Sequence, residues 1–211
     1  MRGGKVSKRA SRRSGVPKRK RIAHHEAGHA VLSAAIGDSP HLVSIRQEGA
    51  SLGRARYRFA ERTEWRVQVH LAGFAAEELL KGVRSKQYYG SDLGLSIAAL
   101  TDERFRDMGE GLETSDQFLA VQDIISLGEA TTRDAIAAEL ERFYLAAKES
   151  LSAIWPVVQS VAKALMSHTE IDDQGFRAAI GARDIYTPVF DVQERHGFLR
   201  RMTTSGGTCN L

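Results

Sequence analysis

The sequence predicts a mainly α-helical protein with a small β-sheet or hairpin, that is, an α+β fold. Two observations predict it. Apolar residues recur at helical spacing over most of the 211 residues, and only the stretch from 43 to 59 has the partial alternation of a half-exposed strand. The composition, with 42% hydrophobic and 27% charged residues, is ordinary for a globular protein that buries one core.

The N-terminal third is expected to form a helix, a strand pair and a second helix. Pro17 suits a first helical turn and Gly37 suits a stop, so the first helix should run from about 17 to 36. Residues 43–45 and 52–59 follow as a hairpin or short sheet. Thr63 is a plausible N-cap for a helix over 64–81 that ends at Gly82.

The remainder predicts further helices. Ser91 and Asp92 open a helical segment, and a polar, glycine-containing connection follows from about 102 to 116. A long helix is expected over 126–152, and Pro156 restarts the chain into a helix over 157–166. Asp172 or Asp173 should begin a last short helix that ends at Ile180, and residues beyond Arg183 are poorly patterned.

Charge and hydrophobic patterning divide the chain into three parts: a basic arm over 1–21, a folded domain over 22–183 and a poorly patterned C-terminal tail over 184–211. The arm has ten Lys or Arg and no acidic residue, whereas the other 190 residues hold 20 basic and 26 acidic ones. We expect the arm to be disordered, with weak contact to nucleic acid or an anionic surface as its candidate role. It also has the composition of an organelle transit segment.

Cysteine usage and hydropathy exclude two classes of protein. The single cysteine, Cys209, permits neither a disulfide framework nor a thiolate zinc site. No apolar run approaches the roughly 20 residues of a transmembrane helix, and the N-terminus lacks the apolar segment of a secretory signal. We therefore expect a cytoplasmic protein without a transmembrane segment, or an organellar one if the arm is a transit segment.

The motif with the clearest chemistry is His25-Glu26-Ala27-Gly28-His29. Residues four apart share one face of a helix, so both imidazoles can reach one zinc ion, with Glu26 beside the metal. Zinc lowers the pKa of a bound water, and a glutamate at this place can act as its general base. The pattern predicts one zinc ion per chain, held by His25 and His29, with Glu26 as the catalytic residue.

A catalytic zinc usually has three protein ligands and one open position. Position 35 is alanine, so the third ligand is not a histidine six residues after His29. Spacing alone does not separate the candidates, which are His41, His70, Glu77, Glu78 and Asp92.

The motif and its surroundings resemble the FtsH family of zinc metallopeptidases. The similar segments are His25 to Ala30, the strand pair, residues 71–78 and Tyr89-Gly90-Ser91-Asp92-Leu93. The last resembles the family's Ser-x-Asp-Leu segment, so the resemblance implies Asp92 as the third zinc ligand and a zincin-type helix followed by a C-terminal helical region. It also implies an endopeptidase that cleaves unfolded or flexible polypeptides, and a homo-oligomer.

The chain also departs from that family. Phe74 stands where the family has arginine, and Gly94-Leu95-Ser96-Ile97 replaces the usual continuation after the aspartate. No G-x-x-x-x-G-K-[ST] loop is present, so we expect an ATP-independent peptidase domain over 22–183 that depends on a separate ATPase partner for any unfolding.

Substrate contacts are expected at the second strand, where Leu52, Gly53 and Arg54 are weak candidates for pairing with an extended peptide. Two other functions stay open. One is a regulatory peptidase that cuts a single partner, and the other is a non-catalytic zinc-binding interaction module.

Overall fold

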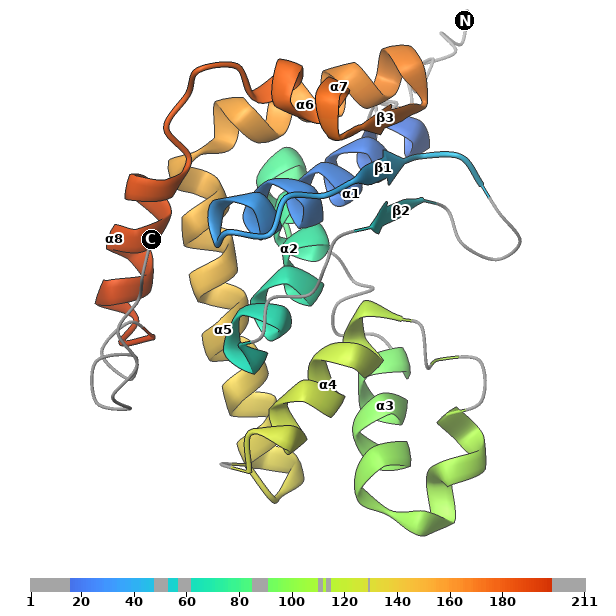
Figure 1. Cartoon of the computed structure of the whole chain (residues 1–211). Coiled ribbons are helices and arrows are strands. Elements are labelled where there is room, and N and C mark those ends of the chain that lie inside the picture. Colours follow the sequence, from blue (N-terminus) through green and yellow to red (C-terminus); the bar gives the residue numbers. More distant parts are fainter. Residues whose placement is uncertain are drawn as a thin grey trace, which may run out of the picture.

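The computed structural model describes residues 16–47, 53–56, 62–84, 91–109, 112, 115–128 and 130–198, with the side chains of 91, 92, 106, 108 and 109 excepted. Most of the basic arm therefore lies outside the described residues, and Lys18 to Arg21 form the first turn of a helix. The described part is mainly helical with one small antiparallel sheet, which confirms the predicted fold class (Figure 1).

The elements follow one another in a simple order. They are α1 (Lys18–Ala35), β1 (Leu42–Ser44), β2 (Arg54–Arg56), α2 (Thr63–Lys81), α3 (Ser91–Thr101), the 3-10 helix η1 (Glu103–Gly109), α4 (Asp116–Ser126), α5 (Arg133–Ala153), α6 (Trp155–His168), β3 (Glu170–Asp172), α7 (Asp173–Ile180) and α8 (Tyr186–Arg195).

Helix α1 is buried along most of its length because small residues allow it to pack closely. A Cβ added at Gly28 would lie 2.7 Å from the Ala72 carbonyl oxygen and 2.7 Å from Ala76 Cβ, so the α1 backbone lies directly against α2 at this point. Alanines fill the same side of both helices and are fully buried, among them Ala27, Ala30 and Ala72. This contact brings the α1 motif against α2.

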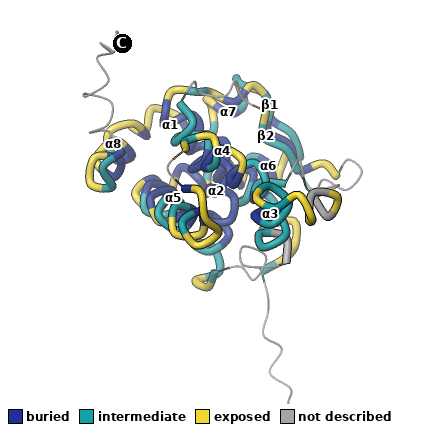
Figure 2. Tube along the Cα trace, turned by 90° about the horizontal axis from the view of Figure 1, so that it is seen from below, coloured by how far each residue is buried: buried dark blue, intermediate teal, exposed yellow. Residues whose placement is uncertain are grey.

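Helix α2 lies at the centre and packs against α1, α4 and α5, so its middle turns are among the most buried of the chain (Figure 2). Gly82 ends it in the left-handed conformation at φ 71°, as its position after the last helical residue predicts. Thr63 is the first helical residue, and Arg62 takes the N-cap place.

The sheet has the order β2-β1-β3. β1 pairs antiparallel with β2, with Val43 opposite Ala55, as the predicted strand pair requires. β1 also pairs antiparallel with β3, with Val43 opposite Ile171. Val43 and Ile171 are buried and Ala55 packs against the same core, so this face of the sheet covers α1. β3 has three residues, too few for a recognisable sequence pattern.

Three other segments differ from expectation. The helix predicted over 126–152 begins only at Arg133, as α5, because Gly128 turns the chain at φ 71° and Thr132 caps α5 by accepting a hydrogen bond from the Ala135 N–H. Residues 116–126 before this turn form a separate helix, α4, that was not predicted. The polar connection before Asp116 contains η1. The segment beyond Arg183 contains α8, which packs on α5.

No helix in the described ranges is both long enough and apolar enough to cross a membrane.

Candidate metal centre

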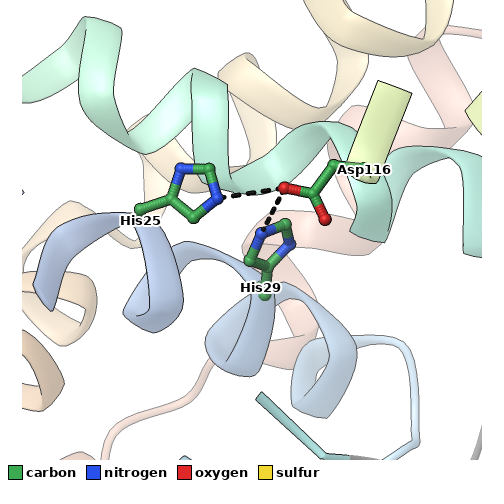
Figure 3. Close-up of side chains that lie close together, drawn as sticks. All are labelled: His25, His29 and Asp116. Atoms are coloured by element: carbon green, nitrogen blue, oxygen red, sulfur yellow. Dashed lines mark hydrogen bonds and ion pairs between the residues drawn. The ribbon is translucent and has the colours of Figure 1, made fainter. Parts of the chain in front are cut away.

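His25 and His29 lie one turn apart on α1, and their rings meet edge to face with centroids 4.7 Å apart (Figure 3). The side chain of His25 is 16% exposed and that of His29 only 4%. The i, i+4 spacing of the motif therefore does place two imidazoles side by side on the buried side of the helix.

Asp116, in the first turn of α4, completes the cluster. Its Oδ2 lies 3.0 Å from His25 Nε2 and 3.3 Å from His29 Nε2, and the three ligand atoms lie within 4.8 Å of one another (Figure 3). Ser115 fixes the start of α4 because its hydroxyl accepts a hydrogen bond from the Phe118 N–H. Two ligands of one tetrahedral zinc lie about 3.4 Å apart at bond lengths of about 2.1 Å, so the two distances from Asp116 are close to those between zinc ligands.

The other nitrogen of each ring is held in place. His29 Nδ1 donates a hydrogen bond to the Val69 carbonyl oxygen at 2.6 Å, and His25 Nδ1 lies 3.1 Å from Glu77 Oε1. A carbonyl oxygen only accepts, so Nδ1 of His29 carries the hydrogen and Nε2 can present its lone pair to a cation. Metal-binding histidines commonly have such a partner, which sets both the ring orientation and the tautomer.

The electrostatics of the cluster favour positive charge between His25, His29 and Asp116. Burial alone would lower the pKa of His25, but Asp116 and Glu77 outweigh it and raise this pKa to about 10. The pKa of His29 is also raised against the effect of burial, by Asp116. Burial would raise the pKa of Asp116, whereas the two imidazoliums hold it well below its ordinary value. The same charge arrangement would stabilise a bound cation in place of the protons.

Glu26 is buried beside the cluster, at 7% exposure. Burial raises its pKa because a buried carboxylate is poorly solvated, and the charges of His25 and His29 oppose that rise. A Cβ added at Gly53 would lie 2.5 Å from Glu26 Oε1, so the backbone just before β2 lies against this carboxyl group. No larger residue fits at position 53 without moving Glu26.

Helix α2 forms the wall behind the histidines. A Cβ at Gly73 would collide with His29 Nε2 and would lie 2.6 Å from His25 Nε2. The Phe74 ring packs edge-on against the His25 ring, with centroids 5.2 Å apart. Glycine at position 73 therefore leaves the room that the two imidazoles occupy.

Of the other residues considered as third ligand, those with described side chains lie elsewhere or act differently. His41 is exposed, and His70 Nε2 lies 3.5 Å from Asp123 Oδ2, one helical turn before Gly73 and Phe74. Glu77 contacts the outer nitrogen of His25 and accepts a hydrogen bond from Lys81 at 2.7 Å. Asp92 begins α3 with Ser91, but its side chain lies outside the described residues.

Glu78 ties α2 to α5 instead of facing the cluster. Its carboxylate accepts hydrogen bonds from Lys148, Tyr144 and Arg84, at 2.7, 2.5 and 3.0 Å. Burial alone would raise the pKa of Glu78, but these three donors hold it below its ordinary value.

Of the three residues predicted to contact substrate, Leu52 lies outside the described residues, Gly53 lies against Glu26, and Arg54 begins the edge strand β2. Gly53 is thus next to Glu26, although the two residues are far apart in sequence.

Asp116 is the residue that sequence reasoning did not single out. It lies at the end of the segment interpreted as a polar connection. A usable signal was present, because Ser115-Asp116 precedes an apolar helical pattern just as Ser91-Asp92 does.

Helix α4 is itself anchored to α2. Arg66 donates two hydrogen bonds to Asp123, at 3.2 and 2.5 Å, and His70 approaches the same carboxylate. Asp123 and Asp116 are two helical turns apart and so lie on one face of α4. The face of α4 that carries Asp116 is therefore held toward α2 and the histidines.

Comparison with known proteins gives one distant similarity. No protein-family model matches the chain. The ATP-dependent zinc metalloprotease FtsH of Thermobaculum terrenum is 26% identical over 188 residues, a match that covers 77% of this chain and 29% of the relative. The chain thus spans less than a third of the length of the curated relative. At this identity the match supports a distant FtsH-like relationship and no more.

Proposed function

We propose that the protein is a zinc-dependent endopeptidase that hydrolyses peptide bonds in unfolded or flexible polypeptides. The observation that carries the proposal is the convergence of His25 Nε2, His29 Nε2 and an oxygen of Asp116, with the outer nitrogens of both rings already held. The distant similarity to a zinc metalloprotease supports the same reading.

We assign the third ligand to Asp116 in place of Asp92. Asp116 contacts both imidazoles, whereas Asp92 was favoured only by its resemblance to a family segment. Both aspartates follow a serine at the start of a helix, so that feature does not distinguish them. The proposed set has two imidazole nitrogens and one carboxylate oxygen, which leaves the fourth position of a tetrahedral zinc for water or substrate.

Each residue then has a separate task. Bound zinc would polarise the substrate carbonyl and bring the pKa of a water toward neutrality. Glu26 accepts a proton from the attacking water and afterwards delivers it to the leaving amine. Glu77 and the Val69 carbonyl keep the two imidazoles in their tautomers and orientations. The side chains of His25 and Asp116, 16% and 27% exposed, form the side that substrate reaches.

The substrate would bind in an extended conformation along the outer edge of β2, because β2 is the last of the described strands in the sheet order. Gly53 lies against Glu26, so a peptide at this edge passes the general base.

Metal content tests the ligand set. The purified full chain should bind about one zinc ion, and His25→Ala with His29→Ala should abolish this binding. Asp116→Asn should weaken zinc binding at least tenfold in a competition titration with a chelating dye, because an amide is a poor zinc ligand. Asp92→Asn is the matched control and should bind zinc like the parent. The opposite ranking of the two aspartate variants would refute the assignment.

Proteolysis tests the chemistry. Glu26→Gln should retain zinc and lose cleavage of casein, an unfolded protein, by a factor of about 10² to 10⁴. Glu194→Gln, an exposed change on α8, should cleave like the parent. If the zinc-loaded parent leaves casein intact, general proteolysis is wrong, and a binding module or a peptidase for one partner takes its place.

A further inference from the structure

We propose that Lys81 is a positioning residue of the metal centre, which acts through Glu77 on the orientation of His25 and so on the affinity for zinc. This inference rests on the proposed function, because it takes His25 Nε2 as a zinc ligand. The juxtaposition that carries it is a carboxylate held between an imidazole and an ammonium group, with Lys81 in the last turn of α2.

The two carboxylate oxygens of Glu77 have different partners. Oε1 lies 3.1 Å from His25 Nδ1, whereas Oε2 accepts a hydrogen bond of 2.7 Å from Lys81 Nζ. A carboxylate is planar, so a short charge-assisted bond at one oxygen also restricts the direction in which the other oxygen points. Lys81 therefore helps to aim Oε1 at the imidazole of His25.

The orientation of Glu77 depends on protein groups because its side chain is only 6% exposed. A buried carboxylate needs polar or charged donors to replace the water it has lost. Lys81, whose side chain is 21% exposed, is one such donor. Arg21 Nε lies farther away, 3.7 Å from the same oxygen, and at that distance it contributes charge without a direct hydrogen bond.

His25 needs this support when its Nε2 binds zinc. The Nδ1 then carries the hydrogen, because the carboxylate oxygen that faces it only accepts. A partner that holds this N–H fixes the plane of the ring, and the loss of such a partner commonly lowers metal affinity by about 10- to 100-fold. Lys81 acts one contact farther from the metal, so we expect an effect at the lower end of this range.

Two ordinary roles for Lys81 make different predictions. Glu77 and Lys81 are four residues apart, and such a pair stabilises any helix slightly, as does a lysine in the last helical turn. Neither role changes the zinc affinity of the folded protein. Direct repulsion between Lys81 and Zn²⁺ has the opposite sign, since removing a nearby cation should tighten zinc binding. Weaker binding without Lys81 is therefore specific to the positioning role.

The experiment measures zinc affinity of the full chain by competition with a chelating dye, together with thermal unfolding of the metal-free protein. Lys81→Met should weaken zinc binding about 10-fold. Its melting temperature should stay within about 4 °C of the parent, because a helix-surface ion pair contributes little to stability. Lys81→Arg should bind zinc within about threefold of the parent, since a guanidinium also donates to a carboxylate.

The matched control is Arg177→Met. Arg177 forms the same kind of ion pair, four residues from its partner Asp173, but on α7. This variant should bind zinc like the parent.

A second background tests whether Lys81 acts through Glu77. Glu77→Gln alone should weaken zinc binding about 10- to 100-fold. In that background Lys81→Met should cause no further loss, because the carboxylate that Lys81 holds is absent. Equal losses in the two backgrounds would overturn the proposal, and so would parental or tighter zinc binding in the single Lys81→Met variant.

The ring proton of His25 gives a readout of orientation that is independent of affinity. In the zinc-loaded protein with isotope-labelled histidine, proton NMR should show a slowly exchanging Nδ1–H on His25, because Glu77 accepts this hydrogen. Exchange with solvent should be faster in Lys81→Met and close to the parental rate in Lys81→Arg. An exchange rate that Lys81→Met leaves unchanged would contradict the positioning role.

These measurements separate the inference from the proposed catalysis. If zinc affinity depends on Lys81 in this way and the parent leaves casein intact, the peptidase function fails and the positioning role stands. If the parent cleaves casein and Lys81→Met binds zinc like the parent, the positioning role alone fails. A full chain that binds no zinc would overturn both.

Discussion

Replacing Gly73 with alanine should remove zinc from the protein without unfolding it. Gly73 lies in the middle of α2, directly behind the two imidazoles. A Cβ there would lie 2.6 Å from His25 Nε2 and closer still to His29 Nε2, whereas ordinary van der Waals contact begins at 3.4 Å. His25 must therefore move away by about 0.8 Å and His29 by more, since the tips of side chains yield before a buried helix does.

That displacement is large for a metal site and small for the fold. Zinc sites tolerate departures of about 0.2 Å from ideal ligand distances, so we expect zinc affinity to fall at least about 100-fold. Alanine gains about 1 kcal/mol of helix propensity over glycine, which offsets the weakened contacts of His25 and His29 with Asp116. The melting temperature of the metal-free protein should stay within about 4 °C of the parent.

The assay pairs two measurements on the same samples: zinc affinity by competition with a chelating dye, and thermal unfolding of the metal-free protein by circular dichroism. Gly94→Ala in α3 is the matched control, because the nearest atom its Cβ would meet is an Arg133 guanidinium nitrogen at 3.7 Å. It should bind zinc like the parent. Gly28→Ala should instead destabilise the fold and lower the melting temperature, because its Cβ meets the α2 backbone.

Parental zinc affinity in Gly73→Ala would refute the reasoning, because it would show that the imidazole positions beside α2 are not those that bind metal. A large loss of melting temperature in the metal-free variant would also contradict it, since the strain would then fall on the helix packing.

Three further predictions follow. Gly53→Ala should keep zinc and lose at least tenfold in casein cleavage, because its Cβ would displace Glu26; equal activity in a proteolysis assay would contradict this. Glu78→Gln should lower the free energy of unfolding at pH 7, measured by urea titration. The pKa of Glu78 is depressed in the folded state, so the difference in stability between parent and variant should shrink as pH falls below about 4.5. Asp123→Asn should weaken zinc binding about 10-fold in the same dye competition, because it weakens the anchoring of α4 by Arg66. Asp191→Asn on α8 is the control and should bind zinc like the parent.

Much of the fold was predictable where its causes are local. The bounds of α2 follow from an apolar stripe and a glycine stop, and both lie within the helix itself. The strands β1 and β2 were expected as a pair because they are near in sequence. β3 was not, since three residues with one apolar member become a strand only when the edge of β1 is available.

The sequence by itself determined the His25-Glu26-x-x-His29 arrangement, because the geometry of one helix places residues four apart on one face whatever surrounds it. It also supplied the glycines at 53 and 73, although it did not say what they accommodate. Only the tertiary structure decided that Asp116 lies against both imidazoles, because that contact depends on how α4 packs on α2 through Asp123 and Arg66. A helix fixes its own side-chain positions, whereas the meeting of two helices distant in sequence is fixed only by the packing of the whole core.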